Sequence, residues 1–336
     1  MRVYEVRESF GIDHLALAER ERPSPGRRQA LVRVRAVSLN YRDLLVAKGL
    51  YNPKIPLPFV PFSDGAGDIV AVGEGVSRVK VGDRVSGIFM QDWLGGELTE
   101  AMTKSALGGG MQGMLSEYVV LDEGGLVHIP EHLSYEEAAT LPCAAVTAWH
   151  ALMETGLKPG ERVLLLGTGG VSIFSLQFVL MAGAEAIITS GSDEKLAKAA
   201  RLGATHGINY KTVPEWDKRV RELTGGTGVD LVVEVGGAGT LPQSIKAVRT
   251  GGRISLIGVL TGASGEINPR PIVMKKIRMQ GIMVGSREMF ESMNRAVSLH
   301  RLRPVIDRVF PFGEAGDALR YMERGAHFGK ICISIG

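Results

Sequence analysis

The feature that most constrains this chain is an apolar run that leads directly into a cluster of glycines. Val163–Leu166 has the pattern of a buried strand, Gly167-Thr168-Gly169-Gly170-Val171 follows it, and a helical pattern begins at Ser172. Glycines at such a turn let a ligand approach the backbone, and the helix N-terminus behind them supplies unpaired N–H groups and a positive dipole end. A pyrophosphate needs this combination, so the segment predicts a dinucleotide site, with Ser172 in place of the usual third glycine. The alternative is an ordinary glycine-rich turn.

The pattern around this loop predicts an α/β protein with a doubly wound parallel sheet. Four further apolar runs suit buried parallel strands: Ala186–Thr189, Leu231–Val235, Ile254–Val259 and Met279–Val284. Helical patterns at 172–183 and 193–203 separate the first three of the five runs, which gives βαβ units. Before residue 124 the chain shows short β-branched runs broken by Pro and Gly, which is typical of an irregular antiparallel β domain.

Charge and cysteine content exclude several classes of function. The 336 residues carry 39 basic and 36 acidic side chains, a net charge of +3, and no basic run, so we expect no nucleic-acid partner. The best apolar stretch, 171–184, is interrupted by polar residues and is shorter than the roughly 20 residues of a membrane span, so we expect no membrane partner. Two cysteines, Cys143 and Cys332, cannot form a disulfide framework, which favours a cytoplasmic location. The expected partner is a small-molecule substrate.

The residues after the second apolar run bear on the identity of the dinucleotide. NAD-selective sites usually place Asp or Glu at the end of this strand for the ribose 2′-hydroxyl, whereas a 2′-phosphate needs neutral donors and a cation. Here hydroxyls stand at Ser190 and Ser192, and a cation stands at Lys195. Asp193 and Glu194 lie between them, but the helix dipole explains carboxylates in the first turn of a helix. The segment favours NADP(H); the alternative is that Lys195 is a plain solvated helix lysine.

Several short motifs, in this order and spacing, resemble one known superfamily along essentially the whole chain. They are Ser38–Asp43, Pro61–Gly67, Gly73–Val76, Val81–Val85, Leu141–Ala148, the glycine loop, Ile208–Tyr210 and Gly329-Lys330. The chain is similar to the medium-chain dehydrogenase/reductases, and within them to zinc-independent members of the quinone-oxidoreductase-like and alcohol-dehydrogenase-like kinds.

This resemblance implies a particular domain arrangement. A GroES-like catalytic domain, here 1–124 and 286–336, is built from both chain ends, and a Rossmann domain, here 125–285, lies between them in the sequence. It also implies an active-site cleft where the two domains meet and a homodimer formed through the last Rossmann strand, here around 281–285.

Zinc-dependent members of the superfamily hold their catalytic metal with a Cys, with the His of a Gly-His-Glu run, and with a second Cys or an Asp. Aligned by motif, this chain has Asn40, then Phe62-Ser63-Asp64, then Cys143 at these positions. One soft ligand cannot hold zinc, and His150 on the same helical face as Cys143 would add only one more. We therefore expect a metal-free site.

The resemblance also assigns roles to individual residues. Asn40 would bond the nicotinamide end or the substrate, and Tyr41, Tyr51 and Ser63 are candidate proton donors, while Asp64 is open between a structural and a catalytic role. The expected cofactor-binding residues, besides Asn40 and the glycine loop, are Thr147, Ser190, Ser192, Lys195, Tyr210, Gly258, Val259, Gly285, Ser286 and Lys330, of which Lys195 and Tyr210 would contact the 2′-phosphate.

Without a Lewis acid, the reaction depends on orientation and on an acceptor that is already activated. The sequence therefore predicts a zinc-independent, NADPH-dependent oxidoreductase that transfers hydride to a quinone, enone or related carbonyl. Two alternatives stay open. One is an NAD(P)-dependent alcohol or aldehyde dehydrogenase in which the Tyr41 hydroxyl serves as acid and base, and the other is a non-catalytic NADPH-binding protein.

Overall fold

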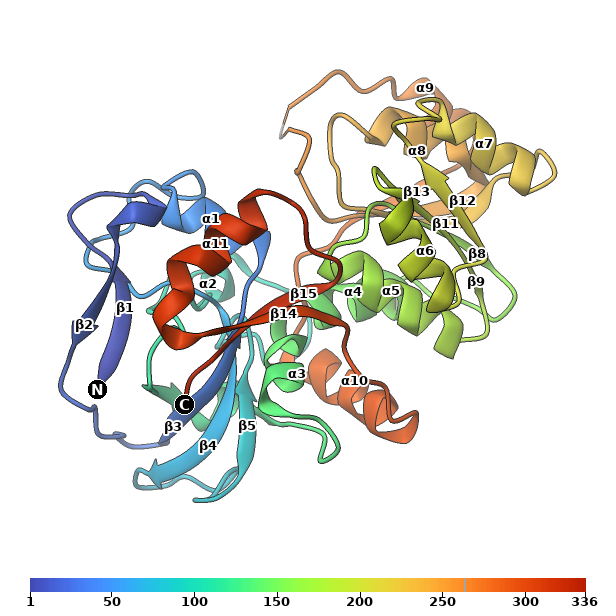
Figure 1. The fold of residues 1–336 in the computed structure, drawn as a ribbon. Coiled ribbons are helices and arrows are strands. Elements are labelled where there is room, and N and C mark those ends of the chain that lie inside the picture. Colours follow the sequence, from blue (N-terminus) through green and yellow to red (C-terminus); the bar gives the residue numbers. More distant parts are fainter. Residues whose placement is uncertain (263) are drawn as a thin grey trace. The chain divides into compact units, whose positions relative to one another are not determined.

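The chain folds into two compact units (Figure 1). The computed structural model describes residues 1–262 and 264–336. The first unit comprises Met1–Val146 together with Val284–Gly336, and the second comprises Thr147–Met283. Residues 125–146, which the sequence prediction assigns to the Rossmann domain, belong to the first unit by this division.

The second unit is built on a six-stranded parallel sheet with the order β10-β9-β8-β11-β12-β13. Its strands are β8 (Arg162–Leu165), β9 (Glu185–Ser190), β10 (His206–Asn209), β11 (Val229–Glu234), β12 (Val248–Leu256) and β13 (Arg278–Gly281). Five of them contain the five predicted apolar runs in part or whole, and the doubly wound parallel sheet is confirmed. The sixth, β10, is a short edge strand in which Ile208 alone is buried, so it has no apolar run that the sequence could reveal.

Helices connect these strands and cover the sheet. They are α5 (Gly170–Met181), α6 (Asp193–Arg201), α7 (Trp216–Leu223), α8 (Leu241–Ala247) and α9 (Arg270–Met274). One core forms where Trp216 of α7 and Leu241 of α8 pack with strand residues such as Leu164 and Val232. This burial stabilises the strand ends that carry the glycine loop, because close-packed apolar surface is the main favourable contribution to folding.

The first unit contains a largely antiparallel sheet with the order β14-β15-β3-β4-β5-β7, in which β6 also pairs with β3. Its strands are β3 (Gln29–Ser38), β4 (Asp64–Val72), β5 (Arg84–Gly87), β6 (Tyr118–Asp122), β7 (Leu126–His128), β14 (Ile306–Pro311) and β15 (Lys330–Ser334), and a separate ladder joins β1 (Arg2–Val6) to β2 (Leu15–Glu19). Ser38 of β3 pairs with Asp64 of β4 on one side and with Cys332 of β15 on the other. Residues from both chain ends therefore meet at one end of β3.

The remaining elements of the chain are short, apart from α10. The α-helices are α1 (Tyr41–Ala47), α2 (Glu100–Thr103), α3 (Tyr135–Ala139), α4 (Val146–Trp149), α10 (Arg287–Leu299) and α11 (Ala315–Glu323), and the 3₁₀ and π segments are η1 (Ile12–His14), η2 (Glu123–Gly125), η3 (Leu141–Ala145), η4 (His150–Glu154) and η5 (Phe312–Glu314). In the sequence, Ser134 followed three residues later by Glu137 predicts a capped helix start, and α3 begins there: the Ser134 hydroxyl and the Glu137 carboxylate cap each other's backbone N–H groups.

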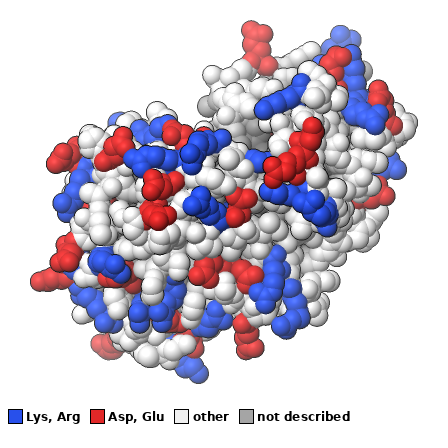
Figure 2. All heavy atoms as spheres, viewed as in Figure 1, with Lys and Arg blue, Asp and Glu red and all other residues white. Residues whose placement is uncertain are grey.

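Two properties of the described residues bear on possible partners. No helix within 1–262 or 264–336 is long and apolar enough to cross a membrane. Figure 2 shows Lys and Arg side chains interspersed with Asp and Glu on the face drawn, with no continuous basic stripe.

Candidate active site

Strand pairing in the first unit brings together three of the predicted site segments. Asn40 follows β3 and precedes α1, and its backbone N–H donates to the Asp43 carboxylate at 2.7 Å, which starts the helix. Asp64 is the first residue of β4, and Lys330 is the first residue of β15. Because β3 pairs with both of these strands near Ser38, their ends converge.

The side chains at this point form one connected hydrogen-bond network. The Lys330 ammonium donates to Asn40 Oδ1 and to the carbonyl of Leu39, both at 2.6 Å. Asn40 Nδ2 donates to Ser63 Oγ at 3.3 Å, and Ser63 Oγ donates to Asp64 Oδ1 at 2.7 Å. The other Asp64 oxygen accepts the backbone N–H of Cys143 at 3.1 Å. We call these residues the Lys330 network.

Burial governs the electrostatics of the network. Desolvation raises the pKa of Asp64, while the Lys330 ammonium and hydrogen bonds from Asn40 and Ser63 oppose that rise. Burial likewise raises the pKa of the neighbouring Asp43 to about 7, with the Arg42 guanidinium opposing it and the Asp64 charge adding to it. The pKa of the Cys143 thiol is raised, chiefly by burial. A thiol whose pKa is raised in this way is a poor nucleophile.

The two candidate tyrosines are half-exposed. Tyr41, the first residue of α1, is 46% exposed, and Tyr51 is 47% exposed. The ring of Tyr51 lies against the Arg42 guanidinium, whose central carbon is 5.0 Å from the ring centre. Neither hydroxyl has a hydrogen-bond partner among the described residues, so both are free to bond a ligand.

The glycine loop of the second unit has the conformation that its sequence predicts. Gly167 adopts φ +73°, which favours glycine, and a Cβ at Gly167 or Gly169 would meet no atom within 4 Å. The loop is therefore open on the side where a ligand would approach. Ser172, in the place of the third glycine, donates its buried hydroxyl to the carbonyl of Leu166 at 2.6 Å and so ties α5 to the end of β8. The residues at this loop fit a dinucleotide pyrophosphate.

The predicted 2′-phosphate residues gather at the end of β9. Ser192 caps α6 by accepting the N–H of Lys195 at 3.4 Å, and the backbone of Tyr210 donates to Ser190 at 3.1 Å. The two acidic residues of this turn have local partners: Asp193 accepts Asn209 Nδ2 at 2.8 Å and Glu194 pairs with Lys198 at 2.9 Å.

A residue that the sequence prediction missed lies at the same place. A Cβ on Gly191 would stand 2.8 Å from the Tyr210 hydroxyl and 3.0 Å from Cε of Lys211, so both side chains lie against this turn. Lys211 directly follows Tyr210 in the sequence, and this adjacency was the signal available to find it.

A second missed residue is the buried carboxylate of Glu234 at the end of β11. It accepts the N–H groups of Gly236 and Gly237 at 2.8 and 3.1 Å and the hydroxyl of Thr240 at 2.6 Å. A Cβ on Gly237 would come within 2.9 Å of the Gly258 carbonyl, so Glu234 holds this turn closely against a predicted cofactor residue.

The other predicted cofactor residues are divided between the units. Thr147, Gly258 and Val259 belong to the second unit, and Gly285 and Ser286 belong to the first. Thr147 is buried, Val259 is exposed, and Ser286 caps α10 by accepting the N–H of Met289 at 3.2 Å.

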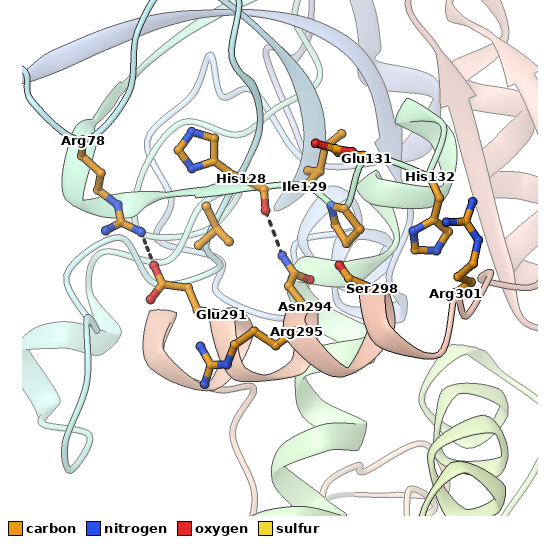
Figure 3. Close-up of a pocket in the computed structure, with 12 residues that line it drawn as sticks. Arg78, His128, Ile129, Glu131, His132, Glu291, Asn294, Arg295, Ser298 and Arg301 are labelled. Carbon is orange, nitrogen blue, oxygen red and sulfur yellow. Dashed lines mark hydrogen bonds and ion pairs between the residues drawn. The ribbon is translucent and has the colours of Figure 1, made fainter.

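A surface groove of about 750 Å³ lies in the first unit between 127–132 and α10 (Figure 3). The Arg78–Glu291 ion pair and a 3.0 Å hydrogen bond from Asn294 Nδ2 to the His128 carbonyl cross it. None of the predicted catalytic or cofactor residues lines this groove.

Comparison with known proteins places these features in a family. Residues 26–131 match the family model for the alcohol dehydrogenase GroES-like domain, and residues 170–298 match the model for zinc-binding dehydrogenases. A zinc-type alcohol dehydrogenase-like protein of Schizosaccharomyces pombe is 46% identical over 98% of this chain and 97% of its own. A quinone oxidoreductase of Sus scrofa is 31% identical over 88% of this chain and 85% of its own. The crystal structure of an NAD-dependent alcohol dehydrogenase superposes with a TM-score of 0.92 at 35% identity over the full length of both chains.

The two-unit fold, the glycine loop Gly167–Val171 and the similarity to known dehydrogenases together define a two-domain oxidoreductase. The chain belongs to the medium-chain dehydrogenase/reductase superfamily, with a GroES-like domain and a Rossmann-like domain. Its relatives include alcohol dehydrogenase-like proteins and quinone oxidoreductases.

The residues at the zinc-ligand positions do not fit that metal. Structural and catalytic zinc sites use thiolate, imidazole and carboxylate ligands, at least three of them from the protein. Here the positions hold an amide, a hydroxyl and a single thiol, and the amide and hydroxyl are engaged in the Lys330 network. Within the part of the chain that the structure describes, no cluster of three His, Cys, Asp or Glu side chains could hold a metal ion.

Proposed function

We propose that this protein is a zinc-independent, NADPH-dependent reductase of quinones, enones or related activated carbonyls. The observation that carries the proposal is the Lys330 network, because two of the three side chains at the zinc-ligand positions, Asn40 and Ser63, bond each other, and Asn40 also bonds a buried ammonium. A site of this composition offers no Lewis acid for an unactivated aldehyde or alcohol. The acceptor must therefore supply its own activation through conjugation.

The cofactor part of the proposal rests on two features of the second unit. Backbone N–H groups of the loop Gly167–Val171 and the N-terminus of α5 would hold the pyrophosphate. Lys195 and Tyr210, with the hydroxyls of Ser190 and Ser192, would hold the 2′-phosphate, since a doubly charged phosphate favours cations and neutral donors. The bound cofactor supplies a hydride from its nicotinamide ring.

Reduction of an enone needs two electrons and two hydrogens, of which one arrives as hydride and one as a proton. A C–H bond forms at the β-carbon, the C=C electron pair moves toward the carbonyl oxygen, and a proton then neutralises the resulting enolate. The half-exposed hydroxyls of Tyr41 and Tyr51 are our candidates for donating that proton, because neither has a hydrogen-bond partner among the residues that the structure describes. The Ser63 hydroxyl donates to Asp64 in the structure, so Ser63 and Asp64 would act by orienting Asn40.

Steady-state kinetics with a panel of acceptors tests this function. NADPH oxidation, with NADH in parallel, would be followed with benzoquinone, methyl vinyl ketone and simple aldehydes in the presence of a chelator. The expected result is turnover of the quinone or the enone, preference for NADPH, and no effect of the chelator. Activity confined to aldehydes, preference for NADH, or sensitivity to the chelator would overturn it. NADPH binding with no turnover of any acceptor would indicate the non-catalytic alternative.

A further inference from the structure

Glu234, the last residue of β11, carries a carboxylate that is fully buried. Every hydrogen bond that the structure describes to this carboxylate comes from an uncharged donor. Oε1 accepts two backbone N–H groups and one hydroxyl, and Oε2 accepts a second hydroxyl; the donors are Gly236, Gly237, Thr240 and Ser244. No Lys, Arg or His side chain within 1–262 or 264–336 forms a salt bridge with Glu234. Uncharged donors ease the desolvation of a carboxylate but do not cancel its charge.

The order of the sheet places Glu234 beside the glycine loop. β11 lies directly beside β8, and Val233 pairs with Leu165, so Glu234 stands next to the residue that leads into the loop. The strands are parallel, so their carboxyl ends lie at one edge of the sheet, which is where dinucleotides bind. The predicted 2′-phosphate residues lie at the end of β9, on the other side of β8. A cofactor with its adenosine over β9 and its pyrophosphate at the loop would therefore place its nicotinamide half over the ends of β11 and β12.

Two connected turns hold the carboxylate at this edge. The first turn, 235–240, follows β11 and contains the N–H groups that Glu234 accepts. The second turn, 257–262, follows β12. The N–H and the hydroxyl of Thr261 in the second turn both donate to the Gly236 carbonyl in the first, at 2.8 and 2.9 Å. Glu234 therefore keeps a fixed position relative to the ends of both strands.

A fixed negative charge at this place distinguishes the two forms of the cofactor. Hydride transfer to the acceptor leaves one positive charge on the nicotinamide ring, because both electrons of a C–H bond depart with the hydrogen. A carboxylate nearby stabilises that positive ring relative to the neutral ring of NADPH, and it does so more strongly in a buried site than in water. A site that binds the oxidised form more tightly favours donation of the hydride, because differential affinity shifts an equilibrium.

We propose that the buried Glu234 carboxylate biases the cofactor site toward NADP⁺ over NADPH and so favours hydride donation to the acceptor. Glu234 is a positioning residue, because it acts through its charge and through the turns 235–240 and 257–262. The proposal rests on the cofactor part of the proposed function. It goes further because it names a residue that sets the direction in which hydride moves.

Binding of the two cofactor forms tests the proposal without any acceptor. The Kd of NADPH is measured from its own fluorescence, and the Kd of NADP⁺ from displacement of NADPH. Glu234→Gln removes the charge and keeps an oxygen for the glycine N–H groups, while its NH₂ group can donate to the Ser244 hydroxyl. We expect this variant to raise the ratio of the NADP⁺ Kd to the NADPH Kd by about tenfold, with the NADPH Kd changed less than about threefold. Glu234→Asp keeps the charge and should keep the ratio within about threefold of the wild-type value, even where both forms bind more weakly.

Asp230→Asn is the matched control. Asp230 lies near the amino end of the same strand, where it pairs with Arg249 at 2.5 Å and accepts the Arg162 N–H at 2.8 Å. The variant removes an equal charge from β11 at the end away from the glycine loop, so it should leave the ratio unchanged. A residue that only shaped the turns would change both Kd values by the same factor. An unchanged ratio in Glu234→Gln, or an equal change in Asp230→Asn, would therefore overturn the proposal.

Thr240→Val decides the question if Glu234→Gln does not fold. This variant keeps the carboxylate and removes the hydroxyl that donates to Oε1 at 2.6 Å. The charge is then less compensated, so the ratio of the NADP⁺ Kd to the NADPH Kd should fall by about twofold or more. A ratio that stays constant or rises would count against the role of the charge.

The outcomes separate this inference from the proposed function. If the wild-type protein reduces benzoquinone or methyl vinyl ketone with NADPH and the ratio does not respond to Glu234→Gln, the inference is overturned and the proposed function stands. If the wild-type protein binds neither NADPH nor NADP⁺, both fail. If it binds both forms but reduces no acceptor, the proposed function fails and the ratio still decides the role of Glu234. A change of the ratio in Glu234→Gln that Glu234→Asp and Asp230→Asn do not share supports the inference.

Discussion

Ser172 Oγ lies 2.6 Å from the carbonyl oxygen of Leu166, so the first turn of α5 is bonded to the last apolar residue before the glycine loop. The bond spans the five-residue segment Gly167–Val171 that would hold the cofactor pyrophosphate, and both of its ends are buried. It shows why a serine can replace the third glycine of the motif. The side chain is small enough for close packing and adds an anchor that glycine lacks.

Loss of this anchor should lower stability and weaken cofactor binding. Ser172→Ala is expected to lower the free energy of unfolding by about 1 kcal/mol, because the Leu166 carbonyl loses a partner in a buried place. Urea unfolding measures this change. Ser175→Ala is the control, since Ser175 is also buried on α5 but its hydroxyl has no hydrogen-bond partner in the described structure. An equal loss in both variants would mean that the bond to Leu166 is not the cause.

The two lysines near the end of β9 should discriminate between the cofactors. We expect Lys195→Ala and Lys211→Ala each to weaken NADPH binding by about tenfold or more, because each would remove a charge-assisted contact with the 2′-phosphate. NADH affinity should stay nearly constant. Binding titrations with both cofactors measure the ratio, and Lys198→Ala on the same helix serves as a control because Lys198 pairs with Glu194. Equal effects of Lys195→Ala on NADPH and NADH would contradict the assignment.

The protein as purified without chelator should contain essentially no zinc. We expect less than about 0.1 zinc per chain by elemental analysis, because the aligned ligand positions provide no set of thiolate and imidazole ligands. Activity should also survive dialysis against a chelator. Stoichiometric zinc, or activity that is lost on chelation and restored by zinc, would disprove the metal-free mechanism.

The buried Asp43 should make stability fall as pH rises toward neutrality. Its pKa is raised to about 7 in the folded protein from an ordinary value of 3.8, chiefly by burial. Between these values the folded chain keeps a proton that the unfolded chain has lost. The free energy of unfolding therefore decreases with pH, by at most about 1.4 kcal/mol per unit for this one group.

Denaturant unfolding of Asp43→Asn between about pH 4 and pH 7 isolates this contribution. The variant keeps an oxygen that can accept the Asn40 N–H but cannot ionise. Its stability should depend less on pH than that of the wild-type protein. The control is Asp92→Asn at an exposed position, which should leave the pH dependence of stability unchanged. If Asp43→Asn also leaves it unchanged, the prediction is wrong.

A homodimer formed through the edge strand β13 remains a proposal, and exposed apolar residues near that strand support it. Val273 and Met274 at the end of α9 are 75% and 71% exposed. Light scattering after size-exclusion chromatography should give twice the chain mass for the wild-type protein and a smaller mass for Val273→Glu/Met274→Glu. Leu299→Glu, which alters an equally exposed residue on α10, should remain dimeric. A monomeric wild-type protein would refute the proposal.

Local sequence was enough to predict the α/β fold, the glycine loop and the capped start at Ser134. Each of these depends on residues that are close together in the chain: the apolar run before Gly167, the helix after it, and the pairing of Ser134 with Glu137 three residues later. The edge strand β10 could not be predicted in this way, because it contains only one buried residue and therefore shows no local apolar pattern.

Tertiary structure alone decided what the predicted site residues do. Sequence patterns and family likeness pointed to Asn40, Ser63, Asp64 and Lys330 separately, but Lys330 and Asn40 are 290 positions apart. Pairing of β3 with β4 and β15 makes these residues neighbours. Their burial lowers the local dielectric constant, which strengthens each hydrogen bond and each interaction between charges. The identity of a residue determines which bonds it can make; which of those bonds it does make depends on strands paired from opposite ends of the chain.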